Sequence, residues 1–200
     1  EKPFFVYFAP GATHAPHHVP KEWIARWKGK FDQGWDKLRE ETLARQIKLG
    51  VVPPGTKLAP KADAIKDWDT LSADEKRLFA RQAEVFAAFL DYTDHEIGRM
   101  LDAVRKTAEA DNTLVFYIFG DNGSSAEGQG GTISELLAQN QIPNTIDQHL
   151  KALDGLGGLD ALGGPKMDNM YHAGWAWAGS TPFQHTKLIA SHFGGTRNPM

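Results

Sequence analysis

The sequence predicts an α/β domain in which a mostly parallel sheet packs against helices. Two short apolar runs, residues 4–8 and 113–119, have the continuous aromatic and aliphatic character of strands that are buried on both faces. A long stretch with helical periodicity separates them. Because a strand, a helical crossover and a second strand make a parallel βαβ unit, this order favours the α/β class.

The composition narrows the class of protein further. With 200 residues and 41% hydrophobic content, the chain can bury one ordinary core. Charged residues make up 24% of the sequence, the formal net charge is −3, and acids and bases are interspersed, which argues against a nucleic-acid partner. The absence of cysteine excludes disulfides, thiolate zinc sites and a cysteine nucleophile. No stretch approaches the roughly 18 to 20 apolar residues of a membrane span.

The first part of the chain predicts a strand, a polar loop and a helical segment, in that order. The strand at residues 4–8 ends at a proline, and the loop over residues 11–20 contains three histidines and two prolines. A surface helical segment is expected over residues 21–49, with Gly50 as its C-terminal stop. Prolines at positions 53, 54 and 60 then mark a connecting loop.

A longer helix is predicted from Ser72 onward. Ser72 and Glu75 have the capping-box spacing that satisfies free backbone N–H groups at a helix start. Apolar side chains at helical spacing then predict a helix that ends near Ala108 and packs on the sheet. These side chains are Phe86, Leu90, Ile97, Leu101 and Val104.

The second predicted strand, residues 113–119, runs directly into a glycine-rich loop over residues 120–132. A long loop of this composition is typical of a functional segment. A short helix that contains Leu136 and Leu137 is expected next, and residues 154–165 have the glycine content of irregular structure.

The topology indicates where a site would form. In open parallel sheets, ligands bind outside the carboxyl ends of the strands, so this rule places the His14 loop on the same edge as Asp121 and Asn122. Asp121 and Asn122 offer a carboxylate and an amide oxygen, which suit Ca²⁺ or Mg²⁺. The same Asp-Asn-Gly pattern is also typical of an ordinary turn.

Two basic residues are candidates for anion binding. His14 can bind an anion or protonate a leaving group, although a histidine in a loop is more often a solvated surface residue. Lys187 can hold an oxyanion as a point charge, whereas most lysines only solubilise a surface. His17 and His18 suggest a transition-metal site with His14, but the three lack the regular helical spacing of known metal signatures.

Two tryptophans, Trp175 and Trp177, alternate with small residues in the manner of a strand or a pocket wall. Core packing is the favoured interpretation of this pair. Stacking on an aromatic or sugar substrate is the alternative.

Three segments resemble motifs of the type I (formylglycine-dependent) sulfatases. Pro-Phe-Phe-Val-Tyr-Phe-Ala-Pro at residues 3–10, with Thr-His-Ala-Pro-His at 13–17, resembles the segment with the family's sulfate-binding histidine. Gly-Asp-Asn-Gly at 120–123 resembles its second pair of metal ligands. Thr-Pro-Phe-Gln-His-Thr-Lys at 181–187 resembles the block with the sulfate-binding lysine. The three motifs occur in the family's order, and the longer string over residues 120–128 together with the Trp175 region suggests a bacterial arylsulfatase-like branch.

The resemblance implies a three-layer α/β/α fold with a mostly parallel central sheet, of the alkaline-phosphatase-like type. Residues 1–200 would form the central part of its catalytic domain. Asp121 and Asn122 would help to hold Ca²⁺, with Mg²⁺ as the alternative, and the ion would polarise the sulfate oxygens. His14 and Lys187 would contact the sulfate and ester oxygens of a small-molecule or glycan sulfate ester.

The family's nucleophile is a formylglycine made from cysteine or serine in a Cys/Ser-x-Pro-x-Arg motif, and these 200 residues contain no such motif. The resemblance therefore leads us to expect the nucleophile upstream of Glu1, and to expect the isolated segment to be inactive. Two alternatives stay open: a phosphonate or phosphate ester hydrolase of the same superfamily, and a non-catalytic relative that binds sulfated glycans. His192 is a further candidate for the same site.

Overall fold

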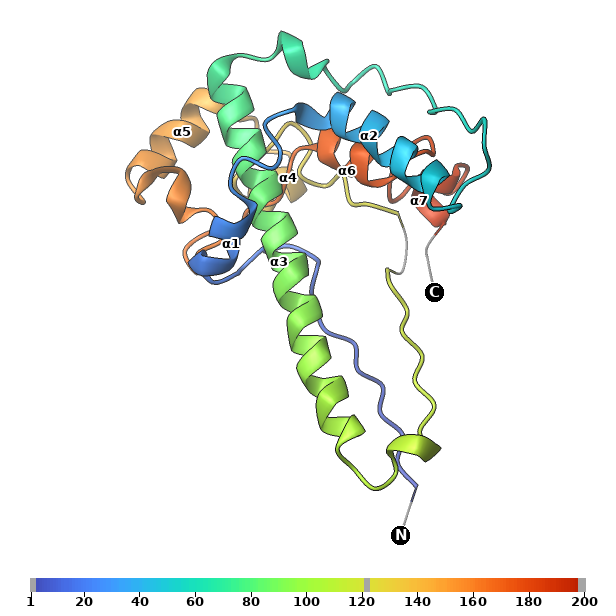
Figure 1. Cartoon of the computed structure of the whole chain (residues 1–200). Helices are drawn as coiled ribbons and strands as arrows, with labels where there is room; N and C mark the ends of the chain where they lie inside the picture. The colour runs from blue at the N-terminus through green and yellow to red at the C-terminus, as the bar shows by residue number, and fades with distance from the viewer. Residues whose placement is uncertain (1–2, 121–122, 198–200) are drawn as a thin grey trace.

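The computed structural model describes residues 3–120 and 123–197, and most of its regular structure is helical (Figure 1). The α-helices are α1 (Lys21–Trp27), α2 (Gly34–Lys48), α3 (Ala73–Arg105), α4 (Glu135–Gln139), α5 (Ile146–Asp154), α6 (Ala173–Gly179) and α7 (Phe193–Thr196). Short 3-10 turns are η1 (Trp68–Thr70), η2 (Ala110–Asn112) and η3 (Gly158–Ala161). Over the part of the chain that the structure describes, no helix combines the length and apolarity needed to cross a membrane.

Helix α3 begins where the sequence predicts. The Ser72 hydroxyl accepts a hydrogen bond from the Glu75 backbone N–H at 3.2 Å, and the Glu75 carboxylate accepts one from the Ser72 N–H at 2.8 Å. These two bonds complete the capping box. The helix ends at Arg105, three residues before the predicted end near Ala108.

The helical segment predicted over residues 21–49 is confirmed as helical but is divided into α1 and α2. The division falls before Gly34, whose φ is +79° and whose missing Cβ leaves room for the ring of Trp68. At the other end, Gly50 has a φ of +73° and donates to the Ile47 carbonyl at 3.1 Å. Val51 donates to the Gln46 carbonyl at 2.9 Å, so Gly50 stops α2 in a Schellman motif, as the sequence predicts.

The core lies where the first half of α3 meets α1, α2 and α6 (Figure 1). Trp35, which is fully buried, meets the rings of Trp68 and Trp175 edge to face. The Trp175 indole N–H donates to the Phe79 carbonyl at 2.9 Å, which satisfies its polar atom inside the core. Core packing is thus confirmed for Trp175 and Trp177, although they lie on a helix, where the alternation suggested a strand or a pocket wall.

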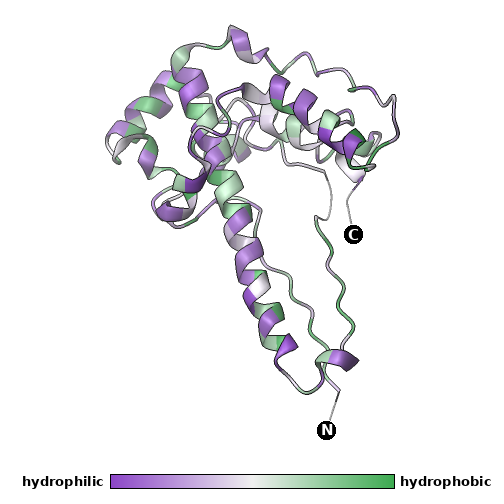
Figure 2. Cartoon of the chain, in the orientation of Figure 1, coloured by the Kyte–Doolittle hydropathy of each residue, from purple (hydrophilic) through white to green (hydrophobic). Residues whose placement is uncertain are grey.

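The two predicted strands are extended but unpaired. Among the described residues, β-pairing is confined to one isolated parallel bridge between Ser134 and Asp168. Residues 4–8 and 113–119 run in the same direction, toward the helical body (Figure 1), and most of their residues are hydrophobic (Figure 2). Phe5 is 90% exposed and Leu114 is 79% exposed. The three-layer α/β/α arrangement with its parallel sheet therefore stays a prediction.

Candidate functional site

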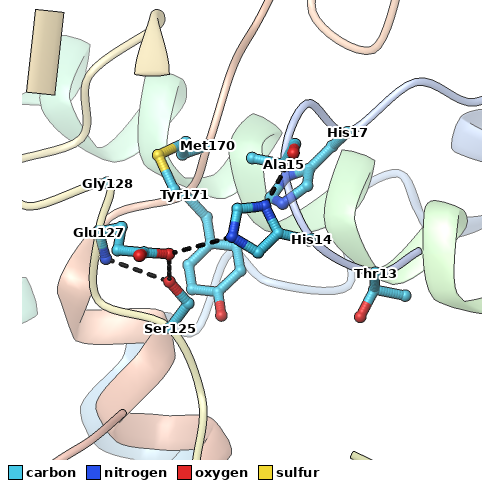
Figure 3. A pocket seen from close by; sticks show the side chains of 9 residues that line it. All are labelled: Thr13, His14, Ala15, His17, Ser125, Glu127, Gly128, Met170 and Tyr171. Carbon is cyan, nitrogen blue, oxygen red and sulfur yellow. Dashed lines mark hydrogen bonds and ion pairs between the residues drawn. The ribbon is translucent and has the colours of Figure 1, made fainter. Parts of the chain in front are cut away.

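Three segments that lie far apart in the sequence line one small cavity (Figure 3). Residues 13–17 come from the loop after the first extended segment, residues 125–128 from the glycine-rich loop, and residues 170–171 from the stretch before α6. The cavity measures about 20 Å³, which is room for roughly one water molecule. The loops that follow the two extended segments thus meet at one place.

The His14 loop is fixed to residues 163–171 by hydrogen bonds. The backbone N–H of Val19 donates to the Gly163 carbonyl at 3.0 Å, and that of His17 donates to the Asn169 carbonyl at 3.4 Å. The ring of His18 bonds the Met167 carbonyl through Nε2. Because a carbonyl only accepts, His18 Nε2 carries the hydrogen.

Lys187 is fixed by its backbone. Its N–H donates to the Ser124 carbonyl at 2.9 Å, and the Gly123 N–H donates to the Gly195 carbonyl at 3.0 Å. A Cβ added at Gly123 would lie 1.7 Å from the oxygen of Gly194, so these backbones approach closely only because glycine occupies the contact. This pairing brings the lysine segment against the glycine-rich loop.

A buried arginine anchors the segment that leads to Lys187. Arg39 on α2 is fully buried and donates to the carbonyls of Trp177, Pro182 and Phe183 at 2.5, 3.0 and 2.6 Å. Its guanidinium also lies 4.2 Å from the centre of the Trp177 ring, in a cation–π contact. Burial lowers the pKa of Arg39 to about 10, so the group stays cationic at neutral pH.

Glu127 lies between the two predicted catalytic residues. Its Oε2 is 3.6 Å from His14 Nε2 and 3.4 Å from Lys187 Nζ, and its Oε1 is 3.5 Å from the same ammonium. The Ser125 hydroxyl donates to Oε2 at 2.6 Å (Figure 3). This hydrogen bond, together with the charges of Lys187 and His14, lowers the pKa of the Glu127 carboxyl below its ordinary value. One carboxylate therefore faces two basic side chains, His14 on the cavity wall and Lys187 beside the cavity.

The orientation of His14 is set by its other ring nitrogen. Nδ1 lies 2.9 Å from the Ala15 carbonyl, and because that oxygen only accepts, Nδ1 carries a hydrogen. Nε2 is therefore the nitrogen that faces Glu127 and can exchange a proton with a ligand. The side chain is 49% exposed, so a ligand can reach it from solvent.

His17 and Tyr171 form a buried floor beside His14. The His17 ring stacks on Tyr171 with centroids 5.5 Å apart and contacts Phe86. Burial, with smaller effects from His14 and His18, lowers the pKa of His17 to about 3, so the ring is neutral at physiological pH. Burial also raises the pKa of the Tyr171 hydroxyl well above its ordinary value. Neither ring supplies a charge to the cavity.

The transition-metal alternative for the three histidines does not agree with this geometry. His14 faces Glu127, His17 is buried among aromatic rings, and His18 bonds a carbonyl. Within residues 3–120 and 123–197, no three His, Asp or Glu side chains gather closely enough to hold an ion. The predicted calcium ligands Asp121 and Asn122 lie outside the described residues.

His14 and Lys187 thus both face the carboxylate of Glu127, whereas His192 does not line the cavity beside them. His192 lines a second cavity of about 430 Å³, bonds Ser191 and contacts the ring of His185.

Glu127 was missed as a site residue by sequence reasoning. Its signal was available, since it is a lone carboxylate among the small residues of the loop after Asn122.

Two basic side chains that converge on one carboxylate have the charge and spacing that suit a small oxyanion. The family model described as "Sulfatase" matches residues 1–200, and the chain belongs to the sulfatase family.

Two curated relatives agree with this membership. The chain is 32% identical over 197 residues to an uncharacterized sulfatase of Schizosaccharomyces pombe (strain 972), a match that covers 98% of the chain and 33% of that protein. It is 30% identical over 128 residues to the arylsulfatase of Klebsiella aerogenes, covering 64% of the chain and 27% of that enzyme. The chain thus spans about a third of the length of the curated relatives it matches.

Proposed function

We propose that the protein containing this chain hydrolyses sulfate monoesters, and that His14 and Lys187 bind the sulfate group. The convergence of the two side chains on a single carboxylate is the observation that carries the proposal. Family membership and the arylsulfatase relative support the choice of sulfate over other oxyanion esters.

The ammonium of Lys187 would pair with the non-bridging sulfate oxygens. Its side chain is only 21% exposed, so the ion pair forms in a partly desolvated site, where a charge interacts more strongly than in water. The backbone bond to Ser124 fixes the origin of the side chain without using the ammonium. Lys187 can therefore follow the charge that develops on the sulfate oxygens as the ester bond breaks.

His14 would act on the leaving group. A proton on Nε2 can pass to the ester oxygen as the S–O bond breaks, so that a neutral alcohol departs. The bond from Nδ1 to the Ala15 carbonyl keeps Nε2 directed into the cavity. Proton donation matters most when the departing alcohol is a poor leaving group.

A divalent cation and a formylglycine complete the proposal. Asp121 and Asn122 carry the oxygen donors that Ca²⁺ prefers, with Mg²⁺ as the alternative, and a bound ion would polarise the sulfate oxygens. The nucleophile would be a formylglycine upstream of Glu1, so we expect the isolated 200-residue segment to show no turnover. We also propose that residues 4–8 and 113–119 are strands of an α/β/α sheet, since their exposed apolar side chains suit burial on both faces.

The experiment compares turnover of an aryl sulfate with that of an aryl phosphate diester by the full-length protein. Lys187→Met is expected to reduce kcat/KM for the sulfate about 100-fold or more, because it removes a charged contact to the reacting group. Lys37→Met is the matched control, since Lys37 pairs with Glu40 on an exposed surface. Preference for the phosphate diester, or equal activity of the two lysine variants, would contradict the proposal.

A further inference from the structure

The carboxylate of Glu127 holds the position of an anion between the two basic side chains. His14 Nε2 and Lys187 Nζ lie 3.6 and 3.4 Å from the same oxygen, Oε2. The Lys187 side chain is 21% exposed and that of His14 is 49% exposed, so solvent screens the lysine less than the histidine. The Glu127 carboxylate is the counter-ion that both basic groups face.

The contacts of Glu127 are of two kinds. The Ser125 hydroxyl donates to Oε2 at 2.6 Å, and the same hydroxyl accepts the Glu127 backbone N–H at 3.3 Å, which fixes the carboxylate in a local turn. The contacts with His14 and Lys187 are longer than the about 2.7 to 2.9 Å of a charge-assisted hydrogen bond. Glu127 is thus held by its own loop, and it holds the two basic groups loosely.

On the basis of the proposed sulfatase function, we propose that Glu127 is a positioning residue that acts as an internal counter-ion. It keeps His14 and Lys187 directed at one point, and the sulfate group binds by exchanging with the carboxylate for these two partners. The exchange runs in reverse after hydrolysis, when the carboxylate competes with inorganic sulfate and favours its release. The charge of Glu127 therefore weakens anion binding in the resting site and speeds product departure.

A neutral isostere separates this role from a structural one. In the full-length protein, Glu127→Gln is expected to bind inorganic sulfate about tenfold more tightly, measured by calorimetric titration at constant ionic strength. The KM for an aryl sulfate is expected to fall, and kcat is expected to fall with it because sulfate leaves more slowly. Loss of a merely structural contact would raise both the dissociation constant and KM, and that result, or unchanged sulfate affinity, would overturn the proposal.

Two further variants complete the test. Glu40→Gln removes an exposed carboxylate that pairs with Lys37, and it should leave sulfate affinity within about twofold of the wild type. In a Lys187→Met background, Glu127→Gln is expected to increase sulfate affinity less than about threefold, because one of the two basic groups for which sulfate and the carboxylate compete is gone. A full tenfold increase in sulfate affinity in that background would refute the proposed exchange of sulfate for the carboxylate.

The outcomes also separate this inference from the function on which it rests. A wild-type protein that neither binds sulfate nor hydrolyses its esters would overturn both. A wild-type protein that does both, together with a Glu127→Gln variant that binds sulfate no more tightly, would overturn only the counter-ion role.

Discussion

Replacement of Arg39 by methionine is expected to destabilise the protein and to weaken its activity together. Methionine retains most of the buried volume, so the main loss is the three hydrogen bonds to the carbonyls of Trp177, Pro182 and Phe183. A hydrogen bond contributes about 1 kcal/mol net, which gives about 3 kcal/mol for the three. The carbonyls of Trp177 and Pro182 keep the backbone N–H donors of Ser180 and Ala59, whereas the Phe183 carbonyl loses its arginine donor. Thr181 adds little, because its hydroxyl still donates to Ala178.

Relief of the buried charge offsets part of this cost. Burial already lowers the pKa of Arg39 to about 10, which shows that the cationic form is penalised at this position. We therefore expect a net loss of about 2 kcal/mol, or a fall in Tm of about 4 to 8 °C for a unit of this size. Sulfate affinity should fall as well, because the released segment carries Lys187.

The assay is urea and thermal unfolding followed by tryptophan fluorescence, with sulfate titration on the same samples. Arg45→Met is the matched control, because Arg45 lies exposed on the same helix and its guanidinium bonds the Thr42 hydroxyl in an exposed contact. That variant should stay within about 0.5 kcal/mol of the wild type. Equal stability of the two variants would refute the reasoning, since it would mean that the three carbonyls need no arginine.

Three further predictions concern the site. His14→Ala should lower kcat about 100-fold or more for an alkyl sulfate and much less for 4-nitrophenyl sulfate, and equal losses would argue against proton donation to the leaving group. Gly194→Ala should lower kcat/KM, measured with the same substrates, because a Cβ there would lie 2.1 Å from the His185 carbonyl and displace the turn that carries Lys187. The pKa of His17 is lowered to about 3 in the folded chain, so its contribution to stability is present above about pH 6.5 and is lost as the pH falls toward 3. The Tm of the His17→Phe variant should therefore fall less than that of the wild type between pH 7 and pH 4. An identical pH dependence of Tm in the two proteins would contradict this.

Local signals in the sequence predicted helix ends well. Ser72 starts α3 and Gly50 stops α2 because each acts through bonds to residues within five positions in the chain. Helix α5 was not predicted, although Thr145 and Gln148 form the same capping-box pattern. The signal is present in the sequence, since Thr145 directly precedes an amphipathic run that contains Gln148.

Other features of the fold and site depend on contacts between segments that are remote in sequence, which local sequence patterns do not predict. The ring of Trp68, remote in sequence, fills the space that a Cβ at Gly34 would occupy, so only glycine fits at the start of α2. Glu127 became a site residue only because the lysine segment and the His14 loop both fold against its loop. Apolar runs such as residues 113–119 predict strands by composition, but a sheet needs partners, and that part of the fold stays a prediction.

The two basic residues of the site are held in place by atoms that take no part in binding an anion. Lys187 is fixed through its backbone N–H on the Ser124 carbonyl, and His14 is oriented through Nδ1 on the Ala15 carbonyl. The Nζ and Nε2 atoms can therefore change partners while the loops stay where they are. Preorganised groups of this kind stabilise developing charge without a reorganisation cost at the moment of reaction. Substitutions that disturb the anchors should thus lower kcat and stability together, whereas neutralising Glu127 should raise the affinity for sulfate.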